Sequence, residues 1–335
     1  GLLLQQAPGC GDDAGAIISI IFEPNHKRKG FQSMKENESM HRGRLSGVFA
    51  PITTPFHEQG DLLLEKLSSN IQRLNQSRLR GYLVLGTNGE FRSLSSHEQM
   101  DVLKTVVKTA SSGKVIMAGT GAESTKVSIE LCHQAAEIGA HYGSLITPFF
   151  FAKKMTDKAL IQHFVQVADQ SPIPVLLYNN PGVTGVTIST AVVKEVSSHP
   201  KILGMKDSSP GNLSAYILNA NPRFSLLAGS ANFFFTGLLM GAVGGVLSLA
   251  DAFPEPCCRL YDLGVNGQLQ EGRELQFQLM ELNQKVSGKF GVAGVKAAMD
   301  FAGFYGGPPR APFPPLTGEE KKKLLEDLKA SGFLK

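Results

Sequence analysis

From about residue 45 onward, the chain alternates short apolar segments with longer amphipathic ones. Most apolar segments are followed by a loop with Gly or Pro and then by a stretch with helical periodicity. The apolar segments are apolar throughout, which is typical of parallel strands covered on both faces. The predicted strands are 47–52, 81–86, 114–120, 142–148, 174–180, 201–207, 224–230 and 243–249.

Eight strand–helix units predict a TIM (β/α)8 barrel. The units span 45–264, close to the ~250 residues that such barrels usually occupy. One expected helix, within 95–110, has Ser95 or Ser96 as its N-cap and Glu98 in its first turn. Residues 265–335 contain three more helical patterns, which we expect to pack on the barrel as a C-terminal appendage. A doubly wound sheet is the main alternative, but eight even units favour a closed barrel.

Residues 1–44 do not follow this pattern. They lack the basic start of a secretory signal and the Arg-rich amphipathic pattern of a transit peptide. An ordinary start that runs into the first strand is found from Met34. We therefore expect 1–44 to be an N-terminal extension, disordered or foreign to the native protein, with 1–33 added upstream. The intact mass of the natively expressed protein would test this.

Composition and spacing argue against several classes of protein. The net charge is only +4 and basic residues are scattered, so nucleic-acid binding is not indicated. The longest mostly apolar run, 233–250, is interrupted by four glycines, so no membrane span is expected. The four cysteines form no CxxC pair and the eight histidines show no metal-ligand spacing. We expect a reducing compartment, no metal and no cofactor.

Lys206 ends the sixth predicted strand, in the sequence ILGMKDSS. A lone lysine after a strand is usually a solvated charge. In a TIM barrel, however, active sites form at the carboxyl ends of the strands. A lysine held against apolar walls has its charged form disfavoured, which favours the neutral amine that attacks a carbonyl. Lys206 is therefore a candidate for a Schiff base that serves as an electron sink for C–C chemistry.

Other polar groups also fall at strand ends. Tyr178 ends the fifth strand, next to the sixth, so its hydroxyl can shuttle protons beside Lys206. Thr87 and Asn88 lie in LGTNGEF, a turn whose backbone N–H groups could hold a carboxylate without an arginine. Each feature taken singly has a structural explanation, such as a packed tyrosine or an ordinary turn. Their shared position at strand ends favours a site.

Several motifs in order along the chain resemble one family. They are GVFAPITTPF, LVLGTNGEF, LITPFFF, PVLLYNNPGVTG, ILGMKDSS and LLAGS. This series is similar to the dihydrodipicolinate synthase / N-acetylneuraminate lyase family over roughly 45–334. GTNGEF, ADQSPIPVLLY, GMKDSS and FAGFYGGPPRAP look closest to its 4-hydroxy-2-oxoglutarate aldolase branch. The resemblance implies a pyruvate-dependent class I aldolase on a TIM barrel.

The resemblance also implies roles for individual residues. Lys206 would be the Schiff-base lysine, and Tyr178 the proton shuttle, with Thr87 as a further catalytic group. Substrate contacts would come from strand ends: Thr87, Asn88, Ser208, Gly229 and Leu247. Family members are usually tetramers built from dimers, so a homotetramer is expected.

Two positions depart from the family pattern. Synthases of the lysine pathway carry an arginine after the strand-five tyrosine, where this chain has Val183, which argues against aspartate semialdehyde as substrate. N-acetylneuraminate lyases also lack that arginine. Phe150 stands where many members have a tyrosine that reaches the neighbouring subunit's site, and it cannot pass a proton. Arg92, Lys153 and Lys154 are candidates for binding a distal carboxylate.

The first functional hypothesis is a lyase that cleaves a 4-hydroxy-2-oxo acid, such as 4-hydroxy-2-oxoglutarate, to pyruvate and an aldehyde such as glyoxylate. A 2-keto-3-deoxy sugar acid aldolase or an N-acetylneuraminate lyase is the alternative, and a 4-hydroxy-tetrahydrodipicolinate synthase is less favoured. A non-enzyme alternative is a pyruvate-binding regulatory protein on the same barrel. We expect a cytoplasmic location, or the mitochondrial matrix if the source is eukaryotic.

Overall fold

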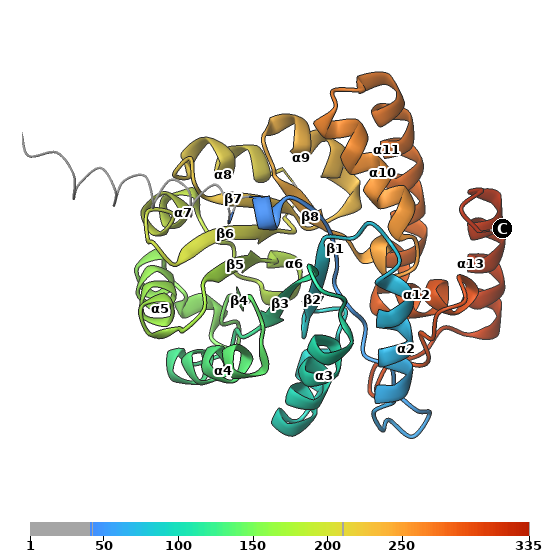
Figure 1. The fold of residues 1–335 in the computed structure, drawn as a ribbon, viewed down its shortest axis with the longest axis horizontal. Coiled ribbons are helices and arrows are strands. Elements are labelled where there is room, and N and C mark those ends of the chain that lie inside the picture. The colour runs from blue at the N-terminus through green and yellow to red at the C-terminus, as the bar shows by residue number, and fades with distance from the viewer. Residues whose placement is uncertain (1–40, 42, 210, 335) are drawn as a thin grey trace, which may run out of the picture. The chain divides into compact units, whose positions relative to one another are not determined.

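The computed structural model describes residues 41, 43–209 and 211–334, and eight parallel strands among them close into a barrel (Figure 1). The strands follow one another around the barrel in chain order, and the first pairs with the last. They are β1 (Gly47–Ala50), β2 (Gly81–Val84), β3 (Val115–Gly119), β4 (Tyr142–Ile146), β5 (Val175–Asn179), β6 (Ile202–Asp207), β7 (Ser225–Ala228) and β8 (Gly244–Val246). The predicted TIM barrel is confirmed.

Each strand is followed by a helix on the outside of the barrel, as Figure 1 shows. The predicted cap of α3 is present, since Ser95 accepts from the Glu98 backbone and Glu98 accepts from the Ser95 backbone. A short helix, α6, precedes α7 in the unit that follows β5. The helices are α2 (Leu64–Leu74), α3 (Ser96–Thr109), α4 (Thr125–Ile138), α5 (Asp157–Gln170), α6 (Pro181–Thr184), α7 (Thr190–Val196), α8 (Leu213–Asn219), α9 (Phe234–Met240) and α10 (Pro254–Val265).

The C-terminal appendage consists of three helices in the same compact unit as the barrel. A π-helical turn (Gln284–Gly288) joins the first two, and a loop joins these to the third. The loop after α12 is fastened to α2, because Asn70 Nδ2 donates to the Tyr305 carbonyl at 2.7 Å. The helices are α11 (Leu269–Asn283), α12 (Lys289–Phe301) and α13 (Gly318–Ala330).

The expected N-terminal extension, 1–44, falls almost wholly outside the described residues. Its last part already contacts the barrel. The Arg44 carbonyl accepts a hydrogen bond from Arg80 Nε at 3.1 Å, and His41 Nδ1 lies 3.0 Å from the Tyr142 hydroxyl. Whether 1–33 belong to the native protein stays a prediction.

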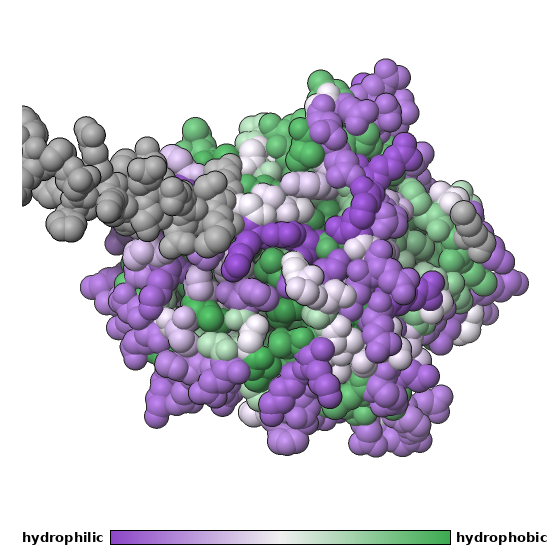
Figure 2. All heavy atoms as spheres, in the orientation of Figure 1, coloured by the Kyte–Doolittle hydropathy of each residue, from purple (hydrophilic) through white to green (hydrophobic). Residues whose placement is uncertain are grey.

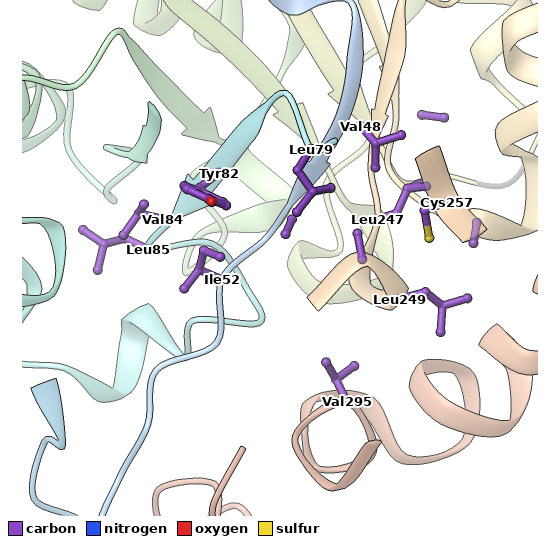
Figure 3. Close-up of a cluster of buried hydrophobic side chains, with 14 of the residues drawn as sticks. Val48, Ile52, Leu79, Tyr82, Val84, Leu85, Leu247, Leu249, Cys257 and Val295 are labelled. Carbon is purple, nitrogen blue, oxygen red and sulfur yellow. The ribbon is translucent and has the colours of Figure 1, made fainter. Parts of the chain in front are cut away.

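The strand side chains are divided between two buried clusters. Val48 and Ala50 of β1 belong to a large cluster shared with the surrounding helices, part of which is drawn in Figure 3. Phe49, between them in sequence, belongs to a second cluster with residues such as Leu83 and Met117 of the next two strands. This alternation is expected for strands with helices on one side and the barrel interior on the other. Both faces are buried, which explains why the strands are apolar throughout.

Hydrophilic side chains form most of the outer rim of the face in Figure 2, and apolar ones gather toward its middle, over the strands. Within the described residues, no helix has both the length and the apolar character needed to cross a lipid bilayer.

Candidate active site

A cavity of about 460 Å³ lies at the carboxyl ends of the strands. Most of the predicted site residues line it: Thr87, Asn88, Tyr178, Lys206, Ser208 and Gly229. Leu247, the remaining one, is completely buried in the large cluster and does not line the cavity (Figure 3). A substrate contact by Leu247 therefore stays a prediction.

Lys206 and Tyr178 face each other across two neighbouring strands. They are direct partners in the register of β5 and β6, so both side chains point to the same face of the sheet. The Lys206 amine lies 4.1 Å from the centre of the Tyr178 ring. Lys206 is 6% exposed and Tyr178 is 4% exposed. The structure thus provides an amine and a phenol in contact, enclosed at the inner end of a cavity.

The Tyr178 hydroxyl is the centre of a small hydrogen-bond network. It lies 3.2 Å from Thr87 Oγ1 and accepts from Asn180 Nδ2 at 2.8 Å. Burial alone would raise the pKa of Tyr178, but the nearby Lys206 charge and the hydrogen bonds with Thr87 and Asn180 lower it below the usual value. A phenol with a lowered pKa releases and takes up protons more readily, which suits a proton shuttle.

The turn that holds Thr87 and Asn88 is conformationally unusual. Leu85 and Glu90, on either side of it, have left-handed backbone conformations with φ of 60° and 51°. Such conformations cost about 1–3 kcal/mol each in a non-glycine residue and persist only where surrounding contacts hold them. Here Thr54 Oγ1 donates to the Gly89 carbonyl at 2.7 Å.

The Glu90 side chain fixes the same turn from the C-terminal appendage. Its Oε1 lies 2.5 Å from Nζ of Lys296 on α12, and its Oε2 accepts from the Arg310 backbone N–H at 2.8 Å. Lys296 also donates to the Pro308 carbonyl at 2.9 Å. The appendage therefore helps to shape the turn that carries two of the predicted substrate-binding residues.

The end of β6 is held in place behind Lys206. Oδ1 of the buried Asp207 accepts from Asn179 Nδ2 at 2.8 Å and from the Ser209 hydroxyl at 2.6 Å. On the other side, the Gly229 N–H donates to the Asp207 carbonyl at 2.6 Å. A Cβ on Gly229 would lie only 2.1 Å from Ser208 Oγ, so this position requires glycine.

The mouth of the cavity contains Arg92 and Val183. The Arg92 guanidinium is ion-paired with Glu123 and lies 4.7 Å from the centre of the Phe149 ring. Apart from Lys206, Arg92 is the only basic side chain among the described residues that line the cavity.

The other predicted carboxylate-binding lysines, Lys153 and Lys154, lie in a 3-10 turn and do not line the cavity. Phe150 is also absent from the lining. It is 75% exposed and packs edge-to-face on Phe151 at 5.0 Å between ring centres.

Two further contributions to the site are absent from the sequence-based predictions. Ser287, Gly291, Val292 and Phe313 of the C-terminal appendage line the cavity, although they lie far from the strands in sequence. Asp251, in the turn after β8, is completely buried and contacts Asn88. Like Lys206, Asp251 is a charged residue at the end of an apolar stretch, and this pattern could have identified it from the sequence.

The site chemistry is that of amine, phenol, hydroxyl and amide groups. Within the described part of the chain, no group of three or more His, Cys, Asp or Glu side chains is arranged to hold a metal ion.

Comparison with known proteins places this geometry in a family. The model of the dihydrodipicolinate synthetase family matches residues 44–331. A 4-hydroxy-tetrahydrodipicolinate synthase of Exiguobacterium is 34% identical over 284 residues, 84% of this chain and 96% of that protein. A probable mitochondrial 4-hydroxy-2-oxoglutarate aldolase of Emericella nidulans is 31% identical over 293 residues, 85% of this chain and 94% of that protein.

Solved structures agree with the sequence relatives. The chloride-inhibited dihydrodipicolinate synthase of Acinetobacter baumannii, solved with pyruvate, superposes with a TM-score of 0.82 at 27% identity, covering 86% of this chain and 99% of that one. The dihydrodipicolinate synthase of Aquifex aeolicus superposes with a TM-score of 0.81 at 27% identity, and it also covers 86% of this chain and 99% of that one. The expected enzyme, a carbon–carbon lyase of the class I pyruvate aldolase type, is confirmed at the level of the family. The chain belongs to the dihydrodipicolinate synthetase family.

Proposed function

We propose that this enzyme cleaves a 4-hydroxy-2-oxo acid to pyruvate and an aldehyde, with 4-hydroxy-2-oxoglutarate, which yields glyoxylate, as its first substrate. The main supporting observation is the buried Lys206 amine, which lies 4.1 Å from the centre of the Tyr178 ring in the lining of the cavity. Thr87 and Asn88 line the same cavity and would receive the carboxylate next to the reacting carbonyl.

The reaction follows from these groups. The Lys206 amine attacks the C2 carbonyl, and loss of water from the carbinolamine gives an iminium. Tyr178 would protonate the departing hydroxyl and then accept the proton from the C4 hydroxyl, with Thr87 passing protons to and from the phenol. As that proton leaves, the C3–C4 bond breaks, its electrons enter the iminium to form an enamine, and the aldehyde is released. Protonation at C3 and hydrolysis return pyruvate and the free amine.

The choice of substrate rests on the cavity mouth. Val183 offers no charge to the carboxylate of aspartate semialdehyde. Arg92 lines the cavity and could bind the distal carboxylate of 4-hydroxy-2-oxoglutarate, although its guanidinium is also paired with Glu123. The 31% identity to the probable aldolase of Emericella nidulans also supports this choice.

A second candidate is synthesis of 4-hydroxy-tetrahydrodipicolinate from pyruvate and aspartate semialdehyde. It is supported by the 34% identity to the synthase of Exiguobacterium. It would use the same Lys206 enamine, which would attack an aldehyde instead of releasing one. Aldolases for 2-keto-3-deoxy sugar acids or N-acetylneuraminate would differ from both in the polar groups that receive a longer distal chain.

One pair of assays separates the two candidates. Pyruvate release from 4-hydroxy-2-oxoglutarate would be followed through a coupled lactate dehydrogenase, and pyruvate consumption would be followed with aspartate semialdehyde. We expect the first reaction to have the higher kcat/KM, and Lys206→Ala to abolish it. The matched control is Lys126→Ala, whose side chain is 87% exposed. A higher kcat/KM with aspartate semialdehyde would overturn the proposed substrate in favour of the second candidate.

Two predictions concern the whole protein. A homotetramer is expected from the family, and the exposed Phe150 and Phe151 rings would lie at a contact between subunits. Light scattering of the purified chain would test this. The location is expected to be the cytoplasm, or the mitochondrial matrix if the source is eukaryotic; the fungal relative is named as a mitochondrial protein.

A further inference from the structure

Asp251 is a buried acid directly behind the predicted carboxylate-binding residue. It ends the short 3-10 turn (Ser248–Asp251) that follows β8, and it is 0% exposed. Its Oδ2 accepts a hydrogen bond from Asn88 Nδ2 at 3.3 Å. Its Oδ1 is buried and has no hydrogen-bond partner among the described residues. A carboxylate in such a position is costly, so its presence calls for a functional explanation.

The turn holds the Asn88 amide at both ends. While Asp251 accepts from Nδ2, the Ser248 hydroxyl donates to Asn88 Oδ1 in a long bond of 3.5 Å. In this arrangement the amide nitrogen of Asn88 faces Asp251 and its oxygen faces Ser248. The second proton on Nδ2 is then available to a substrate carboxylate in the cavity that Asn88 lines.

The charge of Asp251 matters because it is so near to this binding position. Burial raises the pKa of Asp251 to about 8, although the Asn88 hydrogen bond and the Lys206 charge oppose the increase. The carboxyl is therefore mostly neutral at pH 7 and becomes negative as the pH rises through about 8. A negative charge behind Asn88 would repel a substrate carboxylate in front of it.

Other titratable groups near the turn do not change this conclusion. β1, α10, α12 and the π-helical turn pack against it, and β1 contains no titratable side chain. On α10, the Cys257 thiol is fully buried and its pKa is raised well above the usual value, so it stays neutral. Lys296 on α12 and Lys285 in the π-helical turn are paired with other acids. Lys206 on β6 is the cation that acts on Asp251.

We propose that Asp251 is a positioning residue: it orients the Asn88 amide toward the substrate carboxylate, and its ionisation weakens substrate binding at alkaline pH. This inference rests on the proposed function, because it assumes that Asn88 binds the carboxylate of a 2-oxo acid. By reciprocity, a bound carboxylate would in turn favour the protonated form of Asp251.

The test measures the pyruvate concentration that gives half-maximal borohydride trapping at Lys206, read by peptide mass from about pH 6.5 to about 9.5. It compares the wild type with Asp251→Asn, which keeps an acceptor but cannot ionise, and with Asp251→Leu, which removes the acceptor. The matched control is Asp169→Asn, whose side chain is 62% exposed. The Lys206 amine must lose a proton in every variant, so the ratio of wild type to Asp251→Asn at each pH reports the effect of the carboxyl.

We expect the ratio of the half-maximal concentrations, wild type over Asp251→Asn, to rise about fivefold or more between about pH 7 and about pH 9. Asp251→Leu should need more pyruvate at every pH, and Asp169→Asn should follow the wild type. A wild-type pH curve in Asp251→Asn would overturn the inference and leave the proposed function standing. Wild-type affinity in folded Asp251→Leu at about pH 7 would do the same. Folded wild type without any adduct at Lys206 would overturn both proposals.

Discussion

Replacing Lys296 by methionine should weaken both the fold and the turn that carries Thr87 and Asn88. Lys296 is completely buried, and its Nζ lies 2.5 Å from Glu90 Oε1 and 4.5 Å from the centre of the Phe56 ring. Methionine has a similar length but no charge. The substitution would leave the Glu90 carboxylate buried beside the turn without its cation.

The size of the effect follows from the burial of the pair. Removing one partner of a buried ion pair typically costs about 3–5 kcal/mol, because the remaining charge is left uncompensated. Neutralising both partners costs less. Lys296→Met should therefore lose about 3–5 kcal/mol of unfolding free energy, and the double variant Lys296→Met/Glu90→Gln should recover at least about 1 kcal/mol of it.

The assay is urea unfolding, with the free energy obtained by linear extrapolation, together with the half-maximal pyruvate concentration for trapping at Lys206. The control is Lys323→Met, which removes an exposed ion pair with Asp327 and should change stability by less than about 1 kcal/mol. Since Glu90 ends the turn that carries Thr87, Lys296→Met should also raise the half-maximal pyruvate concentration. A single variant as stable as the control would refute the assignment of the pair as a structural element of the turn.

Two further substitutions test the site. Tyr178→Phe keeps the ring but removes the hydroxyl that bonds Thr87, so kcat should fall by about 10²–10⁴-fold, as measured by pyruvate release. A kcat within about twofold of wild type would remove Tyr178 from the proton relay. Gly229→Ala would place a methyl group 2.1 Å from Ser208 Oγ and should cost about 1–3 kcal/mol by urea unfolding. Gly318→Ala, where no atom lies within 4 Å of the added Cβ, should cost nothing, and equal stability of the two variants would contradict the close packing.

The strands could be predicted from the sequence because parallel barrel strands are buried on both faces. β6 ends at Asp207, as predicted, but the other seven predicted strands extend beyond the observed C-terminal ends. Residues 51–52 were included with the first strand, yet β1 ends at Ala50. Pro51 and Ile52 are buried but form no ladder hydrogen bonds. Hydrophobicity indicates burial but not hydrogen bonding between strands, so a buried apolar loop at the end of a strand cannot be told from a continuation of that strand.

The candidate catalytic groups could be predicted to lie together because a barrel collects the carboxyl ends of its strands at one face. Tyr178 and Lys206 were expected together from their positions in adjacent units, and they are register partners. The walls of the cavity could not be predicted in this way. Ser287 and Phe313 reach it from the C-terminal appendage, and no local pattern relates those residues to strands that precede them by tens to hundreds of positions.

The two buried lysines show most clearly what the structure adds. Both Lys206 and Lys296 follow apolar residues in the sequence, and both are nearly or fully buried. Lys296 has a carboxylate at 2.5 Å and a backbone carbonyl at 2.9 Å, and it does not line the cavity. Among the described residues, no carboxylate lies within ion-pair distance of Lys206, whose amine contacts a phenol and faces the cavity. A paired ammonium stabilises a fold, whereas an amine without a carboxylate partner can lose its proton and attack a carbonyl carbon. This difference in partners supports the proposal that the imine forms at Lys206.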